Sequence, residues 1–228
     1  MGLGLAKPEA VFFDWDGTLV DSFDLLHAAH NYTRTQLGIE PFTKDVFKSY
    51  FGQPREKLYA EIYGQENIET AKGYFEAYVL EHHVTGLKPV EGAEAVLDVL
   101  RKLQVPCGVV TNKKRELVES EIRHYGWEDY FVSVVGAGEA EADKPSAAPL
   151  FLAIERSGLD ISAKKTWFIG DTDNDLKCAE GAECISVLIA AAPDAADLLE
   201  KHEVHLHKNN CSELVEFLLQ YMGERLQK

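Results

Sequence analysis

The sequence predicts an α/β fold: a Rossmann-like core with a parallel sheet between two layers of helices (three-layer α/β/α), and an inserted helical-bundle domain. Three observations predict it. Short apolar runs alternate with helical segments over most of the chain, which is typical of parallel strands joined by right-handed crossovers. Residues 21–86 show helical periodicity and almost no strand pattern. The chain has 228 residues, 46% of them hydrophobic, enough for one large domain with an insert.

The apolar run 10–13 is the first expected core strand, because it is short, bounded by polar residues and suited to burial on both faces. From residue 87 onward, strand and helix patterns alternate again. We expect strands at 107–110, 131–135, 166–169 and 184–189 and a short one near 204–206, with helices at 93–104, 114–124, 147–157 and 173–180.

Between the first strand and residue 87, the apolar spacing predicts four helices. We expect them at 23–37, 43–50, 54–63 and 66–83. Four helices in about 65 residues indicate a small bundle. The predicted domains are therefore an α/β core of residues 1–20 and 87–228 and a helical cap of residues 21–86, with hinges near 19–21 and 86–90.

The composition narrows the class of partner. With 23 basic and 38 acidic residues, the formal net charge is −15, which disfavours nucleic acid and anionic membranes but allows a small anionic substrate in a local positive pocket. The sequence has no apolar run of about 18 residues and no signal-peptide pattern at its start, so we expect no membrane span. The four cysteines form no C-x-x-C pair, which favours reduced thiols in a cytoplasmic protein.

Polar side chains follow each of the first four expected core strands. Asp14 and Asp16 follow the first strand, Thr111-Asn112 the second, Lys144 the third, and Asp171 and Asp175 the fourth. Each segment alone is an ordinary turn or helix cap. Because parallel strands present their carboxyl ends at one edge of the sheet, we expect these groups to converge there.

The converging groups have a definite chemistry. Clustered carboxylates with water form an oxygen cage suited to Mg²⁺. A lysine and backbone N–H groups suit a phosphoryl group, whose charge the carboxylates would otherwise repel. One carboxylate can attack phosphorus to give an acyl phosphate, and a second can donate and accept the proton.

Four ordered segments carry a family resemblance: Asp14-Trp15-Asp16-Gly17-Thr18-Leu19-Val20-Asp21-Ser22, Val110-Thr111-Asn112, Lys144-Pro145 and Gly170-Asp171-Thr172-x-x-Asp175. In this order and spacing they resemble the signature motifs of the haloacid-dehalogenase superfamily, over residues 10 to about 220. The segments 109–117 and 144–150, with the helical insert, resemble the phosphoglycolate-phosphatase-like branch, which has a helical cap of the C1 type.

The resemblance implies roles for the reacting groups. Asp14 would be the nucleophile and Asp16 the general acid and base. Thr111, with the backbone N–H of Asn112, would hold the phosphoryl oxygens, and Lys144 would bridge Asp14 and the phosphate.

The resemblance also implies a Mg²⁺ site. Asp14 and Asp171 would bind the ion through their carboxylates, Asp16 through its backbone carbonyl, and Asp175 would bind it or orient its waters. In the cap, Arg55 would contact the non-phosphoryl end of the substrate; a solvated arginine at a helix start is the alternative. Trp15 is larger than the Phe, Leu or Met common between the two aspartates, so it either packs in the core or narrows the site.

These residues together predict a Mg²⁺-dependent phosphatase that hydrolyses a small phosphate monoester through an aspartyl-phosphate intermediate, with 2-phosphoglycolate as the named candidate. One alternative is a sugar-phosphate mutase of the same superfamily. Another is a non-catalytic regulatory or binding protein on the same scaffold. The expected partner is a small phosphorylated metabolite, and the protein is expected to be a monomer or homodimer.

Overall fold

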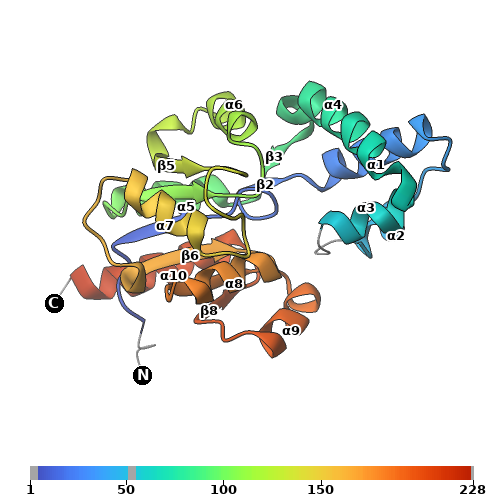
Figure 1. Cartoon of the computed structure of the whole chain (residues 1–228). Helices are drawn as coiled ribbons and strands as arrows, with labels where there is room; N and C mark the ends of the chain where they lie inside the picture. The colour runs from blue at the N-terminus through green and yellow to red at the C-terminus, as the bar shows by residue number, and fades with distance from the viewer. Residues whose placement is uncertain (1–4, 51–54, 227–228) are drawn as a thin grey trace. The chain divides into compact units, whose positions relative to one another are not determined.

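The structure is a computed structural model that describes residues 5–50 and 55–226. The chain divides into two compact units (Figure 1). The α/β unit comprises Met1–Asp21 and Pro89–Lys228, and the helical unit comprises Ser22–Lys88.

A six-stranded parallel sheet forms the centre of the α/β unit, in the order β5-β4-β1-β6-β7-β8. Its strands are β1 (Ala10–Phe13), β4 (Cys107–Val110), β5 (Phe131–Val135), β6 (Thr166–Gly170), β7 (Ile185–Ile189) and β8 (Leu206–Lys208). The central strand β1 is buried at all four positions, as the apolar run predicted. Two shorter strands, β2 (Val20–Asp21) and β3 (Lys88–Pro89), form a separate two-stranded sheet.

Helices cover both faces of the large sheet (Figure 1). Alternate residues of β1 point to opposite faces, and Phe12 packs on the face covered by α7 (Ala148–Arg156) and α8 (Asp173–Gly181). On the other face, Trp167 packs against aromatic rings of α10 (Cys211–Leu226), and α10 packs on α5 (Ala93–Lys102). The predicted three-layer α/β fold is confirmed.

The last strand lies further along the chain than the sequence predicts, at Leu206–Lys208 rather than near 204–206. The reason is a side-chain contact: Ser186 Oγ accepts a hydrogen bond from the backbone N–H of His205 at 3.3 Å and lies 2.9 Å from its Nδ1. These side-chain bonds take the place of strand pairing between Ser186 and His205. The pairing of β7 with β8 therefore starts one residue later, at Val187 and Leu206. Helices α9 (Ala192–Lys201) and α10 follow β7 and β8 and were not predicted from the sequence.

The helical unit contains α1 (Phe23–Gln36), α2 (Lys44–Lys48), α3 (Arg55–Tyr63) and α4 (Ile68–Gly86). Helices α1 and α4 pack along each other. Aromatic rings fill the core between the helices, and the buried His30 Nδ1 lies 2.6 Å from the Tyr63 hydroxyl. Among the residues that the structure describes, no helix is long and apolar enough to cross a membrane.

Candidate active site

The candidate site begins where β1 ends. The backbone N–H of Asp14 donates to the Ile169 carbonyl at 2.9 Å, so Asp14 still lies alongside β6 as the chain leaves the sheet. Trp15, the next residue, is fully buried against Trp127 and Phe131. Asp14 and Asp16 therefore flank the buried indole, and their carboxylates pair with different lysines, Asp14 with Lys144 and Asp16 with Lys113.

Four of the predicted site residues lie together at this edge of the sheet, and we call them the Lys144 cluster: Asp14, Lys144, Asp171 and Asp175. The Lys144 Nζ lies 2.6 Å from Asp14 Oδ1 and 2.7 Å from Asp175 Oδ1. One carboxylate oxygen from each aspartate lies within 4.8 Å of the others. The Lys144 side chain is only 3% exposed, so the pairing occurs out of bulk water.

Asp175 is fixed by its place at the start of α8. Its Oδ2 accepts from the backbone N–H of Thr172 at 2.9 Å, from the Thr172 hydroxyl at 2.6 Å and from the N–H of Asp171 at 3.2 Å. Thr172 and Asp175 form a capping box, which satisfies donors at the helix start. The other oxygen, Oδ1, pairs with the Lys144 ammonium. The Asp175 side chain therefore both caps the start of α8 and fixes the position of Lys144.

Asp171 is held by the turn that follows Asp16. The Thr18 hydroxyl donates to Asp171 Oδ1 at 2.8 Å. Gly17 has a φ of +87°, and a Cβ built there would lie 2.3 Å from Asp171 Oδ2. Only glycine permits both this backbone conformation and this close approach, so the glycine of the first motif makes room for the carboxylate of the fourth.

The electrostatics of the Lys144 cluster reflect an excess of negative charge. Burial raises the pKa of Asp14 to about 7; Lys144 opposes the shift and the Asp175 carboxylate adds to it. Burial, with Asp175 and Asp14 nearby, also raises the pKa of the Asp171 carboxyl well above its usual range. Burial disfavours the Lys144 ammonium, but Asp14 and Asp175 outweigh it and raise the lysine pKa.

The donor set of the Lys144 cluster fits a divalent cation. Three carboxylates and one ammonium leave two negative charges uncompensated when all are ionised. Carboxylate oxygens are hard ligands of the kind that Mg²⁺ binds. The cluster can therefore hold a divalent ion, and Asp14, Asp171 and Asp175 would supply its ligands.

The segment after β4 supplies Thr111 and Asn112. Thr111 is buried, and its hydroxyl accepts from the backbone N–H of Lys113 at 3.2 Å. The Asn112 side chain bonds the backbone of Lys144 twice, donating to its carbonyl at 2.8 Å and accepting from its N–H at 3.0 Å. The sequence predicts a phosphate-binding role for the Asn112 backbone; in the structure the Asn112 side-chain amide also fixes the loop that carries Lys144.

Lys113 is the other residue near the site that the sequence analysis missed. Its Nζ lies 3.2 Å from Asp16 Oδ1 and 2.8 Å from Glu121 Oε1, and Glu121 is fully buried in α6 (Arg115–Tyr125). Burial raises the pKa of the Glu121 carboxyl despite Lys113. The sequence pattern does indicate this pair, because Glu121 falls on the same helix face as the apolar Val118 and Ile122. A carboxylate buried on such a face needs a cationic or hydrogen-bonding partner.

Arg55 cannot be placed in the same way. Its backbone begins α3 in the helical unit, and its side chain lies outside the described part of the structure. The other predicted site residues all belong to the α/β unit.

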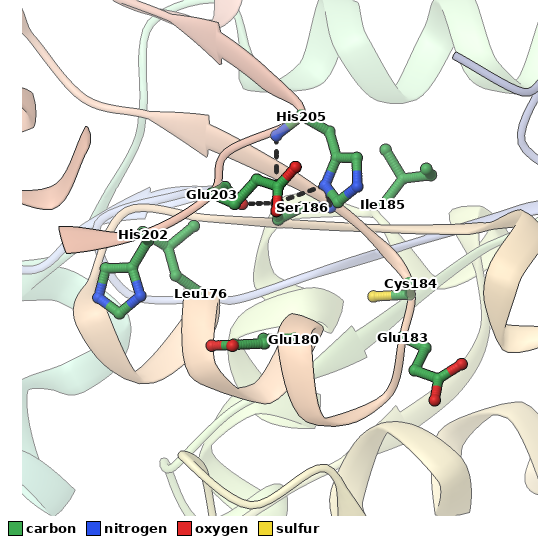
Figure 2. Close-up of a pocket in the computed structure, with 9 residues that line it drawn as sticks. All are labelled: Leu176, Glu180, Glu183, Cys184, Ile185, Ser186, His202, Glu203 and His205. Atoms are coloured by element: carbon green, nitrogen blue, oxygen red, sulfur yellow. Dashed lines mark hydrogen bonds between the residues drawn. The ribbon is translucent and has the colours of Figure 1, made fainter. Parts of the chain in front are cut away.

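A separate cavity of about 270 Å³ lies at the opposite edge of the sheet, beside the start of β7 (Figure 2). Glutamates and histidines give it polar walls: Glu180, Glu183, Glu203, His202 and His205. Figure 2 shows hydrogen bonds from Ser186 to the His205 ring and to the Glu203 backbone carbonyl. These bonds join β7 to the segment that precedes β8. Among the described residues, no lysine or arginine lines this cavity, so its lining is poorly suited to a phosphate ester.

The four cysteines are free and buried. Burial raises the thiol pKa of Cys107, Cys178 and Cys184 to about 12 and of Cys211 to about 11. Thiols with such pKa values remain protonated near neutral pH and are poor nucleophiles. The aspartates of the Lys144 cluster are therefore the better candidates for nucleophilic chemistry.

Comparison with known proteins gives one family. The family described as haloacid dehalogenase-like hydrolase matches residues 11–189. The phosphoglycolate phosphatase of Neisseria meningitidis is 33% identical over 195 residues, which cover 82% of each chain. The pyrophosphatase PpaX of Bacillus velezensis is 26% identical over 206 residues, 90% of this chain and 94% of that protein.

Solved structures share the fold. A haloacid dehalogenase-like family hydrolase from Streptococcus pneumoniae superposes with a TM-score of 0.80 at 21% identity, over 93% of this chain and 98% of that one. At this level of identity the likeness concerns the fold alone.

Proposed function

This chain belongs to the haloacid dehalogenase-like hydrolase family, as its motifs predicted, and from that premise we propose that it is a Mg²⁺-dependent phosphatase of small phosphate monoesters. The observation that carries the proposal is the Lys144 cluster: a buried lysine 2.6 Å from Asp14, beside two further carboxylates. Such a cluster offers a nucleophile, a cation for the phosphoryl group and ligands for a divalent ion.

Asp14 is the proposed nucleophile. One oxygen is held by Lys144 at 2.6 Å, and the other can attack phosphorus. The phosphorus–oxygen bond to the leaving group breaks as the bond to Asp14 forms, and the product is an aspartyl phosphate. Lys144 lies where it can bind an oxygen of the transferred group and offset its charge.

Asp16 is the proposed general acid and base. It would donate a proton to the departing alkoxide and then take one from the water that hydrolyses the aspartyl phosphate. Its side chain is 29% exposed, whereas that of Asp14 is 10% exposed, so Asp16 is the more accessible of the two to an incoming ester.

Thr111 and backbone N–H groups are the proposed ligands of the remaining phosphoryl oxygens. Asp14, Asp171 and Asp175 are the proposed side-chain ligands of Mg²⁺, with the backbone carbonyl of Asp16 as a further one. When bound, the ion would neutralise charge that otherwise opposes an anionic substrate.

The helical unit is proposed to act as the cap domain that selects the ester, with Arg55 contacting its non-phosphoryl end. The relatives favour 2-phosphoglycolate as the first substrate to test, and inorganic pyrophosphate as the second. We further propose that the protein acts in the cytoplasm, since its four buried thiols are free.

A phosphate-release screen tests the function. Purified protein with Mg²⁺ is assayed on 2-phosphoglycolate, pyrophosphate, several sugar phosphates and nitrophenyl phosphate. Release of phosphate from at least one ester supports a phosphatase, and absence of release from all of them refutes it. Conversion of a sugar phosphate to its isomer without release would instead identify a mutase.

Arg55→Ala tests the specificity. We expect KM for the best ester to rise several-fold while nitrophenyl phosphate is hydrolysed as before, because the substitution removes a contact to the non-phosphoryl end only. An equal effect on both substrates would contradict this role for Arg55.

A further inference from the structure

A second lysine, Lys113, lies close to the proposed general acid and base. It belongs to a chain of contacts that we call the Lys113 cluster: Asp16, Lys113, Glu121 and Trp15. The Lys113 ammonium lies 3.2 Å from Asp16 Oδ1, 2.8 Å from Glu121 Oε1 and 2.9 Å from Glu121 Oε2. Lys113 therefore forms ion pairs with both carboxylate oxygens of Glu121 and with one carboxylate oxygen of Asp16.

Exposure decreases along this chain of contacts. The side chains of Asp16, Lys113 and Glu121 are 29%, 10% and 0% exposed. The inner end is thus anchored in the protein, and the outer end reaches the solvent-accessible edge. A buried glutamate is costly unless it is paired, so this one needs its partners.

The indole of Trp15 is a further partner of Glu121. Its Nε1–H donates to Glu121 Oε2 at 2.5 Å. Phenylalanine, leucine or methionine at this position would fill space but donate no hydrogen bond. The unusual tryptophan of the first motif is therefore matched to the unusual buried glutamate of α6.

We propose that Lys113 and Glu121 are positioning residues that fix the carboxyl group of Asp16 for proton transfer to the leaving oxygen. The inference rests on the proposed function, because it assigns Asp16 its role as general acid. Within the described residues, Asp16 Oδ2 has no hydrogen-bond partner, while Lys113 holds Oδ1. Glu121, held in turn by Trp15, prevents the long lysine side chain from moving away.

This role makes the effect of the cluster depend on the leaving group. In the first step the proton passes from Asp16 to the ester oxygen as the phosphorus–oxygen bond breaks. An alkoxide needs that proton because it is strongly basic, whereas nitrophenolate leaves without it. Since kcat/KM reports this first step, loss of positioning should lower it for alkyl esters and spare it for nitrophenyl phosphate.

The test is the double variant Lys113→Met/Glu121→Gln, which removes the cation and its buried counter-charge together. We expect kcat/KM for the best alkyl phosphate to fall about 10- to 100-fold, part of the 10²–10⁴-fold that general acid catalysis contributes. For nitrophenyl phosphate we expect a fall of less than about 3-fold. An equal fall for both esters, or none for either, would overturn the proposal.

Glu121→Gln alone is the second variant in case the double variant does not fold. Glutamine keeps the shape and can still accept from Trp15, so no buried charge is left unpaired. We expect the same selectivity with a smaller loss, about 3- to 10-fold for the alkyl ester. Equal effects on the two esters would count against the proposal here too.

The matched control is Lys164→Met/Glu183→Gln. This pair joins a lysine and a glutamate at 2.8 Å on the surface, with side chains 72% and 69% exposed. It should leave both kcat/KM values unchanged. If the wild-type protein hydrolyses neither ester, the proposed function fails; if it hydrolyses both but the cluster variants show no selectivity, only the positioning role fails.

Discussion

Two lysines at one edge of the sheet each bridge two carboxylates, yet their surroundings differ. Lys144 lies between Asp14 and Asp175 at 2.6 and 2.7 Å, and a third carboxylate, Asp171, lies close by. Lys113 lies between Asp16 and Glu121 at 3.2 and 2.8 Å, and an indole N–H also donates to Glu121. The first cluster has surplus negative charge, and the second balances its buried acid.

The difference indicates two roles for a buried lysine–carboxylate pair, one in binding and one in orienting a side chain. The Lys144 cluster holds three carboxylates and one ammonium, so its donor set fits a divalent metal ion, which would offset charge that repels an anionic phosphoryl group. The Lys113 cluster has a partner for each buried oxygen, so it suits orientation rather than binding. Buried pairs of this kind contribute little net stability, but loss of one partner is costly. The predictions below compare the two clusters, from the largest expected effect to the smallest.

Asp14→Asn should reduce phosphate release by about 10⁴-fold or more, because the amide cannot form the acyl phosphate. In metal-free protein its unfolding midpoint should be at least as high as that of the wild type, since one of three crowded carboxylates is neutralised. A phosphate-release assay measures the rate, and thermal unfolding followed by circular dichroism measures the midpoint. Hydrolysis at the wild-type rate would refute Asp14 as the nucleophile.

Lys144→Met should lower the free energy of unfolding by about 3–5 kcal/mol, because buried carboxylates lose their cation. Urea unfolding of metal-free protein measures the change. Lys164→Met is the control, since that lysine is 72% exposed and its loss should not shift the midpoint. Wild-type stability in Lys144→Met would mean that Lys144 does not offset the buried charge.

Lys113→Met should lower the free energy of unfolding less, by about 2–3 kcal/mol, because Asp16 is partly hydrated and Trp15 still donates to Glu121. Adding Glu121→Gln should restore most of the loss, since it removes the unpaired buried charge. The same urea experiment gives the comparison. A double variant less stable than Lys113→Met would show that Glu121 does not depend on Lys113.

Mg²⁺ should stabilise the wild-type protein by about 1.4–2.7 kcal/mol at concentrations of about 10 to 100 times its Kd. Asp171→Asn should weaken this stabilisation, and Lys113→Met should keep it, because we assign the ion to the Lys144 cluster. Thermal unfolding with and without Mg²⁺ tests this without an activity assay. Equal stabilisation of wild type and Asp171→Asn would remove Asp171 from the metal site.

Much of the Lys144 cluster could be predicted from the sequence. Apolar runs located the strands, and the carboxyl ends of parallel strands meet at one edge, so Asp14, Lys144 and Asp171 had to converge. The family motifs then assigned them roles. What the sequence did not indicate is that Asn112 fixes the Lys144 backbone, because that bond joins two loops whose conformations depend on each other.

The Lys113 cluster was harder to predict. Lys113 stands in a run of charged residues typical of a solvated surface, and its partner Glu121 is buried only because α6 packs that face inward. The last strand was misplaced for a similar reason, since the contact between Ser186 and His205 that delays it is tertiary. Local patterns locate elements well, but pairs between distant elements require the folded structure.

The position of β1 has a consequence for how the protein is made. β1 leaves the ribosome well before β4 and β6, the two strands with which it pairs. Synthesis proceeds at about 5–20 residues per second, so this apolar strand waits about 8–30 s before both neighbours have been made. During that interval its edges are open to wrong partners and to chaperones. Because the Asp14 N–H bonds the Ile169 carbonyl of β6, we expect Asp14 to reach its folded position only after β6 has docked, late in the folding of the chain.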